Sequence, residues 1–419
     1  MPMEISSGIL SGIITFLQLL LWGIFFYYLV ISAFGWFKRK ESPAESYPIV
    51  NKFAIIVSAH NEERVIGNIV RNLKGLNYPR NMYDIFVVAD NCTDNTFNVA
   101  KDNGAIAFER FDTSKRGKGF SLEWMFKRLF EIQNEYEAIC IFDADNLVSP
   151  NFLLEMNKQL CNGHKVIQGY LGSKNPNDSW VSGNHSIAYW ISNRLFQLPR
   201  YYIGLSCALG GTGFVMRTDV LKEIGWGATC LTEDLEFSLK LVLKGMRVSW
   251  SHEAIVYDEK PLKLAQSWRQ RNRWMQGHCD CAARYLKKLL VKGIKERNAV
   301  ALDSALYLIQ PFVIVANGIG LIIGLGVVII NFNSFINVNS ISFGLLILAL
   351  TYINILFVFA EGKLSKRIVM YFLVFPLYSL TWVPIIIQGF FNRNKKEWAH
   401  TLHTRALEIN DIESLEKVG

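Results

Sequence analysis

The common cysteine-based and nucleotide-binding signatures are missing from this chain. Its seven cysteines form no C-x-x-C pair, and the one close pair, Cys279 and Cys281, has no matching pair elsewhere. This pattern argues against a zinc site and a disulfide framework, and it predicts reduced thiols on a cytosolic domain. No G-x-G-x-x-G follows the first apolar strand and no P-loop is present, so dinucleotide binding and ATP hydrolysis find little support.

Charged residues are also scarce. They make up 19% of the 419 residues, whereas 51% are hydrophobic and 13% are aromatic. This composition is apolar for a soluble enzyme, and the length has room for two or three domains. The net charge of +8 fits a nucleic-acid binder, but it fits a membrane protein with basic cytoplasmic edges equally well.

The apolar residues are concentrated in long runs at both ends of the chain. No charge lies between Glu4 and Lys38, a stretch long enough to span a bilayer. It has no basic leader and no obvious cleavage site, so we predict a retained anchor, with Lys38–Lys40 in the cytoplasm. Further apolar runs cover about 303–330, 341–360 and 367–391. The sequence therefore predicts a multi-pass protein of the cell membrane with a cytoplasmic middle domain.

The last run leaves the side of the C-terminal tail open. The basic loop Lys363–Arg367 is expected to be cytoplasmic, so a single crossing by the last run would place the tail outside. The tail, however, begins NRNKKEW, a basic composition that is typical of the cytoplasmic side. Pro376 and Pro384 would also fit a broken, re-entrant segment that does not cross. Both topologies remain open from the sequence.

Between these runs, apolar strands alternate with helical stretches. The segments KFAIIVSAHNEE, DIFVVADNCTDNT and AICIFDADN each predict a strand that ends in a polar loop. Helices are predicted over Val65–Leu76 and from Thr96, which together indicate an α/β domain with a largely parallel sheet. Ligands bind beyond the carboxyl ends of such strands, where Asn61, Glu62, Asp90, Asp143 and Asp145 are expected to lie.

Three motifs of the middle domain suit catalysis, although each also has a plainer interpretation. Asp143 and Asp145 in FDADN are spaced to converge on one hard cation, but a solvated turn has the same spacing. In LTEDLEF, Glu233 and Asp234 either supply a general base or favour the N-terminus of a helix. The glycines of GGTGFVMR, residues 210–217, either let the backbone approach a ligand or form a turn.

The stretch SWRQRNRWMQGH, residues 267–278, interleaves cations with aromatic rings and fits nucleic acid, a membrane surface or an active site. On a helix its arginines would spread around the cylinder, whereas nucleic acid requires them on one face, so we expect no nucleic-acid partner. The basic amphipathic run ARYLKKLLVKGIKE that follows favours a membrane surface. Arg269 and Arg271 are expected to be surface or lipid-facing charges.

Taken in order, these motifs resemble those of the family 2 inverting glycosyltransferases. The order is Asp90, then D-x-D (Asp143, Asp145), T-E-D (Thr232–Asp234) and Q-x-x-R-W (Gln270, Arg273, Trp274). Within that family, the motifs resemble those of the membrane-bound processive synthases, whose well-known members make cellulose, chitin, hyaluronan and poly-N-acetylglucosamine. The resemblance covers roughly residues 50–390. In one departure, the family often has two acids after the second strand, whereas here Ala89 precedes a single Asp90.

The resemblance implies a fold and a division of the chain. It implies a cytosolic α/β GT-A domain with a Rossmann-like nucleotide-sugar site, plus an α-helical transmembrane region with amphipathic interface helices. The expected parts are the anchor and its basic flank (1–45), the GT-A domain (46–260), the Q-x-x-R-W segment with interface helices (261–300), the C-terminal transmembrane helices (301–392) and a polar tail (393–419). In similar synthases a segment after the last spans folds over the nucleotide pocket. Trp398, Thr401, His403 and Arg405 would do so only if the tail is cytoplasmic, and a solvated tail is the alternative.

The resemblance also implies residue roles. The nucleotide-sugar would be bound by His60, Asn61, Glu62, Asp90, Lys118, Asp143, Gln270 and Arg273, with Asp90 at the base and Arg273 at the pyrophosphate. Asp145 and Asp143 would hold Mg²⁺ or Mn²⁺. Asp234 would deprotonate the acceptor hydroxyl, with Glu233 as its supporting neighbour. The acceptor would lie against Trp274, Gly211, Thr212 and Gly213.

The implied reaction transfers a sugar from UDP-N-acetylglucosamine or UDP-glucose to the end of a growing β-linked polysaccharide. Export would follow through the transmembrane region of the enzyme, and a need for accessory subunits is left open. An alternative that shares the same motifs is the transfer of one sugar to a membrane lipid. A scaffold or receptor with an inactive transferase domain is disfavoured, because all the acidic residues are present.

Overall fold

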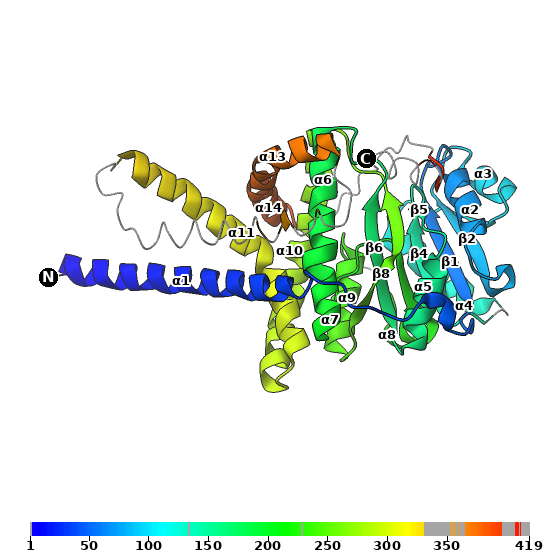
Figure 1. Ribbon diagram of the computed structural model, residues 1–419, viewed down its shortest axis with the longest axis horizontal. Coiled ribbons are helices and arrows are strands. Elements are labelled where there is room, and N and C mark those ends of the chain that lie inside the picture. The colour runs from blue at the N-terminus through cyan, green and yellow to red at the C-terminus, as the bar shows by residue number, and fades with distance from the viewer. Residues whose placement is uncertain are drawn as a thin grey trace.

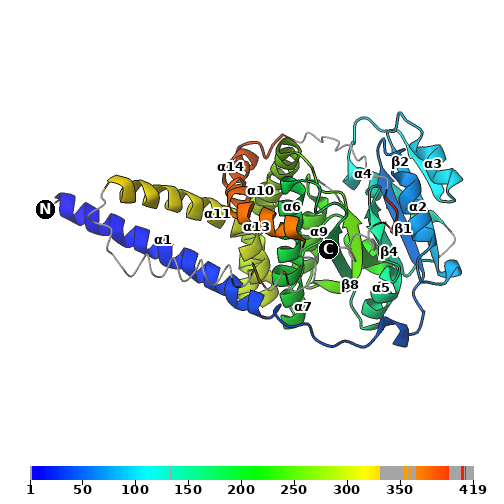
Figure 2. The same cartoon turned by 45° about the horizontal axis from the view of Figure 1, so that its top comes forward.

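A computed structural model describes residues 2–132, 135–227, 229–330 and 365–395, with positions 353, 355, 356, 359, 407–409 and 411. An α/β domain forms one end of the molecule, and the long helices α1 (Pro2–Ala33) and α11 (Ala299–Ile330) project from it in the same direction (Figures 1 and 2). Most of the predicted 341–360 run and all of KEWAHTLHTR lie outside the described residues.

The α/β domain is built on one mixed sheet of eight strands in the order β3-β2-β1-β4-β7-β6-β8-β5. The strands are β1 (Phe53–Ala59), β2 (Tyr83–Asp90), β3 (Ile106–Arg110), β4 (Ala138–Asp143), β5 (Leu147–Val148), β6 (Val166–Ser173), β7 (Phe214–Arg217) and β8 (Val248–Asp258). The first four strands in this order are parallel, as predicted. In the other half, β6 and β8 are also parallel to each other, whereas β7 is antiparallel to β4 and β6, and β5 is antiparallel to β8. The sheet is therefore largely parallel as expected, but mixed because of β7 and β5.

Helices bury both faces of the sheet, which explains the unbroken apolar run of β1. Ala54 and Ile56 belong to the core on one face, whereas Phe53, Ile55 and Val57 belong to the core on the other. A strand covered on both sides loses the usual alternation of polar and apolar residues. The helices of the domain are α2 (Ile66–Lys74), α3 (Thr96–Asp102), α4 (Lys118–Glu131), α5 (Phe152–Cys161), α8 (Thr218–Ile224) and α9 (Glu233–Leu243). The helices predicted near Val65 and Thr96 are therefore confirmed.

A second group of helices lies between the sheet and the projecting pair. Helix α6 (Trp180–Ile191) continues through a π-helical segment, Ser192–Gln197, into α7 (Leu198–Ile203), and α10 (Leu264–Lys295) runs beside it (Figure 1). Helix α13 (Lys366–Leu380) packs on α6, and α14 (Trp382–Phe391) packs on α10 and α11. The last apolar run is thus broken at Thr381 into two helices. Among the described residues, Ala299–Ile319 and Lys366–Phe391 are long and apolar enough to cross a membrane.

A buried ion pair anchors the projecting helices to the domain. Arg200 of α7 donates from Nε and Nη2 to the two carboxylate oxygens of Asp303 in α11, each at 2.9 Å. Tyr27 of α1 donates to the same carboxylate at 2.9 Å, so one acidic residue joins three helices. Because a bidentate arginine–carboxylate pair fixes direction as well as distance, these contacts orient α1 and α11 relative to the sheet.

Candidate active site

One cavity of about 350 Å³ opens at the carboxyl ends of β1, β2 and β4. It is lined by thirteen of the residues that were predicted to act, contributed by the strand ends, the start of α4, the glycine loop before β7, α9 and α10. They are His60, Glu62, Asp90, Lys118, Asp143, Asp145, Gly211, Thr212, Glu233, Asp234, Gln270, Arg273 and Trp274. Segments as far apart in sequence as His60 and Trp274 therefore meet at one edge of the sheet, as the carboxyl-end rule predicts.

Two predicted residues, Asn61 and Gly213, do not line this cavity. Asn61 has a φ of 54° and its side-chain oxygen accepts a hydrogen bond of 2.8 Å from the backbone of Thr93, so it joins the loops after β1 and β2. At Gly213 a Cβ would lie 2.3 Å from Val256, so glycine is required for packing against β8. Both residues shape the loops that carry the lining residues.

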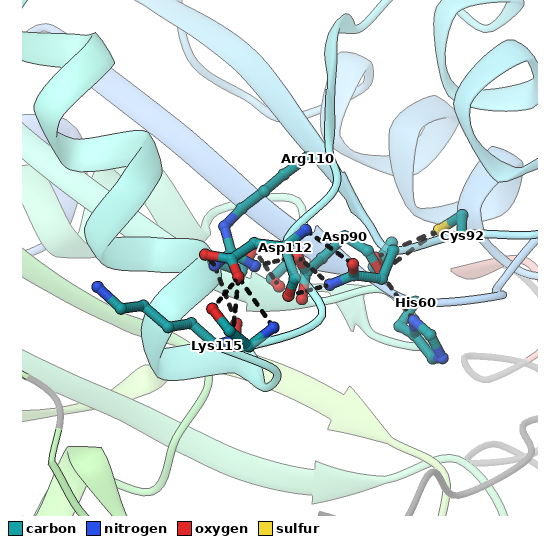
Figure 3. A network of polar contacts seen from close by, with 11 residues as sticks. His60, Asp90, Cys92, Arg110, Asp112 and Lys115 are labelled. Carbon is teal, nitrogen blue, oxygen red and sulfur yellow. Dashed lines mark hydrogen bonds and ion pairs between the residues drawn. The ribbon is translucent and has the colours of Figure 1, made fainter.

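The carboxylate of Asp90, at the end of β2, is held by a buried arginine (Figure 3). Arg110 of β3 donates from Nη1 to Asp90 Oδ1 at 2.5 Å, and its side chain is 4% exposed. His60 Nδ1 lies 2.7 Å from the backbone oxygen of Asp90, which fixes the imidazole at the rim of the cavity. Burial raises the pKa of Asp90, although the Arg110 guanidinium opposes this shift. Arg110 was missed by the sequence reasoning, although it also ends a strand.

The same arginine orders the loop that leads to Lys118 (Figure 3). Arg110 Nη2 donates to the backbone oxygen of Lys115 at 2.9 Å, and Asp112 accepts hydrogen bonds from the backbone of Ser114 and Lys115. Lys118 then begins α4, and its ammonium group forms an ion pair with Asp143 and donates to the carbonyl of Gly211 at 2.7 Å. The positive charge therefore faces the D-x-D motif in this structure.

The D-x-D motif is tied to the glycine loop and to the end of β8. The backbone nitrogen of Asp143 donates to Thr212 Oγ1 at 3.1 Å. Asp145 is 5% exposed, and its Oδ2 accepts a hydrogen bond of 3.2 Å from the backbone of Glu259. Asp258, which ends β8, also lines the cavity, and the nearby Asp145 and Asp143 add to the effect of burial in raising its pKa. Three carboxylates thus lie near one another.

This cluster fits a hard divalent cation, because Mg²⁺ and Mn²⁺ prefer carboxylate and phosphate oxygens. Two of these carboxylates already have a cationic partner, because Lys118 pairs with Asp143 and Lys260 with Asp258. Within the parts of the chain that the structure describes, no group of three or more His, Cys, Asp or Glu side chains is placed to hold a metal ion. The two D-x-D carboxylates would therefore leave positions for the ligand's own oxygens.

The acidic pair of the T-E-D motif begins α9 and faces the glycine loop. Asp234 Oδ1 accepts a hydrogen bond of 2.8 Å from the backbone of Leu235, so the predicted helix-start role is found. Its Oδ2 lies 3.3 Å from the Cβ position of Gly211, so glycine leaves this oxygen open to the cavity. Burial raises the pKa of both Glu233 and Asp234, and Asp234 raises that of Glu233 further, while Lys118 and Arg273 oppose the shift.

The Q-x-x-R-W residues reach the cavity from one face of α10. Gln270, Arg273 and Trp274 are spaced by three and four residues, so they share a side of the helix. The Oε1 atom of Gln270 is buried and has no hydrogen-bond partner among the residues that the structure describes. The ring of Trp274 lies 5.7 Å from His185 and 6.4 Å from Tyr189, both on α6. The oxygen of Gln270 can accept a hydrogen bond from an O–H or N–H of a ligand, and the ring of Trp274 offers a surface for an acceptor sugar.

The expected surface position of Arg271 is wrong. Its side chain is fully buried, donates to Thr381 Oγ1 at 2.9 Å and stacks on the rings of Tyr378 and Trp382 at 4.5 and 5.0 Å. The physical reason is that α13 and α14 return to cover the side of α10 that faces away from the cavity. Arg269, in contrast, is exposed as expected.

The sequence reasoning also missed other lining residues, among them Tyr189, Cys230, Asp258 and Glu259. Asp258 and Glu259 had a usable signal, because Asp258 ends the strand VSWSHEAIVYD and Glu259 follows it, as other acids of the site end their strands. Tyr189 and Cys230 had none, since a tyrosine within a helix and a cysteine within a loop have no characteristic spacing.

The comparison with known families agrees with this geometry. Residues 51–277 match the family described as glycosyltransferase like family 2. The chain belongs to glycosyltransferase family 2. It is therefore a transferase, and the matched region contains all eight strands of the sheet, the three acidic motifs and the Q-x-x-R-W segment.

Individual relatives of this family 2 glycosyltransferase have different names. The "probable glycosyltransferase YdaM" of Bacillus subtilis (strain 168) is 23% identical over 360 residues, which cover 81% of this chain and 82% of the relative. The beta-monoglucosyldiacylglycerol synthase of Nostoc sp. (strain PCC 7120) is 28% identical over 55% of this chain and 49% of the synthase. The poly-beta-1,6-N-acetyl-D-glucosamine synthase of Staphylococcus aureus (strain COL) is 25% identical over 60% of this chain and 62% of the synthase. The chain thus spans about half to two thirds of the two synthases.

A solved structure supports the fold. The mannosyltransferase PcManGT from Pyrobaculum calidifontis, in complex with GDP-Man and Mn²⁺, superposes with a TM-score of 0.60 and 16% identity. The match covers 92% of this chain and 99% of the mannosyltransferase. The family 2 glycosyltransferase described here therefore has a GT-A-like α/β fold with a mixed sheet.

Proposed function

We propose that this family 2 glycosyltransferase transfers a sugar from a UDP-sugar to a hydroxyl acceptor at a membrane surface, with inversion at the anomeric carbon. The observation that carries the proposal is the meeting of the D-x-D, T-E-D and Q-x-x-R-W residues in one cavity. A carboxylate for the acceptor and a guanidinium for the leaving diphosphate are thereby available to the two ends of a single displacement reaction.

Asp234 is the proposed base. Its Oδ2 faces the cavity beside Gly211, and a carboxylate there takes the acceptor's proton as the hydroxyl oxygen bonds to the anomeric carbon. The glycosidic oxygen of the nucleotide leaves from the opposite side, so the configuration inverts. Arg273 would stabilise the charge that develops on the diphosphate, and Trp274 would stack against the acceptor sugar.

Asp145 and Asp143 are proposed to hold Mg²⁺ or Mn²⁺, which would supply charge neutralisation for the departing diphosphate. Lys118 already pairs with Asp143, so this lysine is placed to move toward the diphosphate when the cation binds. Asp90, held by Arg110, would accept a hydrogen bond from the uracil ring of the nucleotide, beside His60 and Glu62.

The donor is proposed to be UDP-N-acetylglucosamine or UDP-glucose. The relatives named as synthases transfer sugars of these two kinds, whereas the mannosyltransferase of similar fold was solved with GDP-Man. A single carboxylate at the base position accepts an N–H of uracil or of guanine, so Asp90 does not discriminate between the two. The donor test therefore has to include GDP-mannose.

The acceptor is proposed to be a growing β-linked polysaccharide, and one observation favours a membrane lipid as the second candidate. Trp274, at the acceptor end of the cavity, also packs in the cluster formed by Met275, Ile385 and Ile386 of α10 and α14. The acceptor end therefore borders the apolar helices, where a lipid-bound hydroxyl would arrive.

A donor and product assay tests both parts of the proposal. Purified enzyme with Mn²⁺ and membrane lipids is expected to release UDP from one of the two UDP-sugars and no GDP from GDP-mannose. The labelled product is then separated into organic and aqueous fractions. A polymer supports the polysaccharide acceptor, a single extractable glycolipid supports the lipid, and release from GDP-mannose alone would refute the proposed donor.

We further propose that α13 and α14 lie along the membrane surface without crossing it. Leu407 and Ile409, after the last run, pack on Leu147 and Tyr257 of the α/β domain, and Asn68 donates to the backbone oxygen of Leu407 at 3.1 Å (Figure 1, red). The C-terminal tail and the α/β domain would then lie on the same side of the membrane. If α1, α11 and the 341–360 run each cross once, both lie in the cytoplasm, which would resolve the conflict posed by the basic tail.

Site-directed labelling checks this topology. A cysteine introduced at Asp411 is expected to remain unlabelled by an impermeant maleimide in intact cells and to react after permeabilisation, as an introduced cysteine at exposed Glu45 of the domain should. The chain's own cysteines are replaced beforehand to remove background. Labelling of the Asp411 position in intact cells, with the Glu45 position protected, would place the tail outside and contradict the proposal.

A further inference from the structure

Helix α10 contacts the segment that carries the proposed base at several points. Arg284 Nη1 donates to Thr229 Oγ1 at 2.7 Å, and Tyr285 donates to Glu236 Oε1 at 2.8 Å. Nearer the cavity, the sulfur of Cys281 lies 3.6 Å from that of Cys230. The residues on α10 share the face that presents Arg273 and Trp274 to the cavity, so one rigid helix contacts both the substrate site and the base segment.

The closest of these contacts is made by Gly277. A Cβ at this position would lie 2.4 Å from Thr232 Oγ1, 2.6 Å from its Cγ2 and 2.9 Å from its Cβ. Glycine is unfavourable inside a helix, so its presence in the middle of α10 indicates a need for close approach. Thr232 immediately precedes Glu233 and Asp234, and its side chain does not cap α9. Because Thr232 is bonded to this acidic pair, its packing against Gly277 affects where Glu233 and Asp234 lie.

The opposite face of α10 is equally close to α14. A Cβ at Gly389 of α14 would lie 2.5 Å from Met275 Cβ and 3.2 Å from the backbone nitrogen of Gln276. Helix α10 is thus held between α14 and Thr232, with a glycine at each contact. Added volume at Gly277 is not relieved by movement of α10 toward α14, because that side is already in close backbone contact.

We infer that Gly277 is a positioning residue that sets the distance between α10 and Thr232 and thereby places Asp234 in the cavity. This inference rests on the proposed role of Asp234 as the base. A displacement of about 1 Å at a reacting group lowers the rate on the order of 10²-fold. An added methyl group at Gly277 moves the base relative to Arg273 and Trp274, which α10 itself carries.

The test compares the added methyl in two backgrounds. Gly277→Ala in the natural chain is expected to lower kcat by at least about tenfold. In a Thr232→Gly chain the three closest contacts of the same methyl are removed, so it should change kcat less than about threefold. Gly75→Ala is the matched control, because a Cβ there meets no atom closer than 3.5 Å. An equal loss in both backgrounds would overturn the inference.

A second measurement is independent of activity. The diazene oxidant diamide takes one hydrogen from each of two thiols, becoming a hydrazine while Cys230 and Cys281 join in a disulfide. This bond is expected to form in the natural chain and at least about tenfold more slowly in Gly277→Ala, with recovery in the double variant. If transfer proves not to be the activity, this rate still reports the position of the segment.

Folding is measured on the same proteins. If Gly277→Ala does not fold, recovery of a cooperative thermal transition in Gly277→Ala/Thr232→Gly supports the contact. Failure of the double variant to recover either folding or the disulfide rate would refute it. Normal disulfide formation combined with loss of transfer would locate the defect outside the Gly277–Thr232 contact.

Discussion

Replacing Asp234 with asparagine is expected to lower kcat for sugar transfer by roughly 10²–10⁴-fold, the usual contribution of a general base. Asparagine keeps the size of the side chain and can still accept the hydrogen bond from Leu235, which lies at 2.8 Å from Oδ1. It cannot take the proton of the acceptor hydroxyl. The affinity for UDP, measured by calorimetry with Mn²⁺, should therefore stay near that of the natural chain while UDP release in the presence of acceptor is lost.

The pH dependence separates Asp234 from its neighbour. Burial raises the pKa of the pair, so the base is protonated and inactive at low pH, and kcat should rise with pH at values above the usual aspartate range. Asp234 raises the pKa of Glu233 to about 7, whereas burial is what raises the pKa of Asp234. Glu233→Gln should therefore leave the rise at nearly the same pH, with most of kcat retained. If Asp234→Asn keeps the kcat of the natural chain, or if only Glu233→Gln loses kcat, then the general base is not Asp234.

Much of the donor half of the site could be predicted because its chemistry is carried by strand ends. A buried parallel strand is visible as an apolar run, and the acid after it has to lie at the carboxyl edge, so Asp90, Asp143 and Asp145 could be placed from the sequence. The antiparallel strands gave a weaker signal. Strand β7, for example, is only four residues long, and its partners β4 and β6 are far away in sequence.

The covering of α10 could not be predicted, because helical spacing defines faces but not what packs on them. The basic–aromatic stretch has one face toward the cavity and another toward α13 and α14, whose residues follow about one hundred positions later. A buried arginine on such a face has the same sequence signature as one at a membrane surface. The contact between Gly277 and Thr232 is likewise a property of two segments brought together by the fold.

Alanine variants of the three arginines in residues 267–278 test this difference between the two faces of α10, and one of them should cause a second large loss of activity. Arg273→Ala is expected to lower kcat by roughly 10²–10³-fold, as the loss of one donor to a developing oxyanion does, with thermal stability unchanged. Arg271→Ala should instead lower the free energy of unfolding by roughly 1–3 kcal/mol, because its buried guanidinium stacks on Tyr378 and Trp382. Activity per folded molecule should largely remain.

Arg269→Ala is the matched control. It removes the same positive charge from the same part of α10, but from a side chain that is exposed. It should change neither kcat nor the thermal midpoint, both measured in the same detergent. If all three variants lose transfer equally, the stretch acts through its total charge at the membrane and not through the cavity. If Arg271→Ala loses kcat without losing stability, then the contact of α10 with α13 and α14 affects the chemistry directly, and the two faces of the helix are not independent.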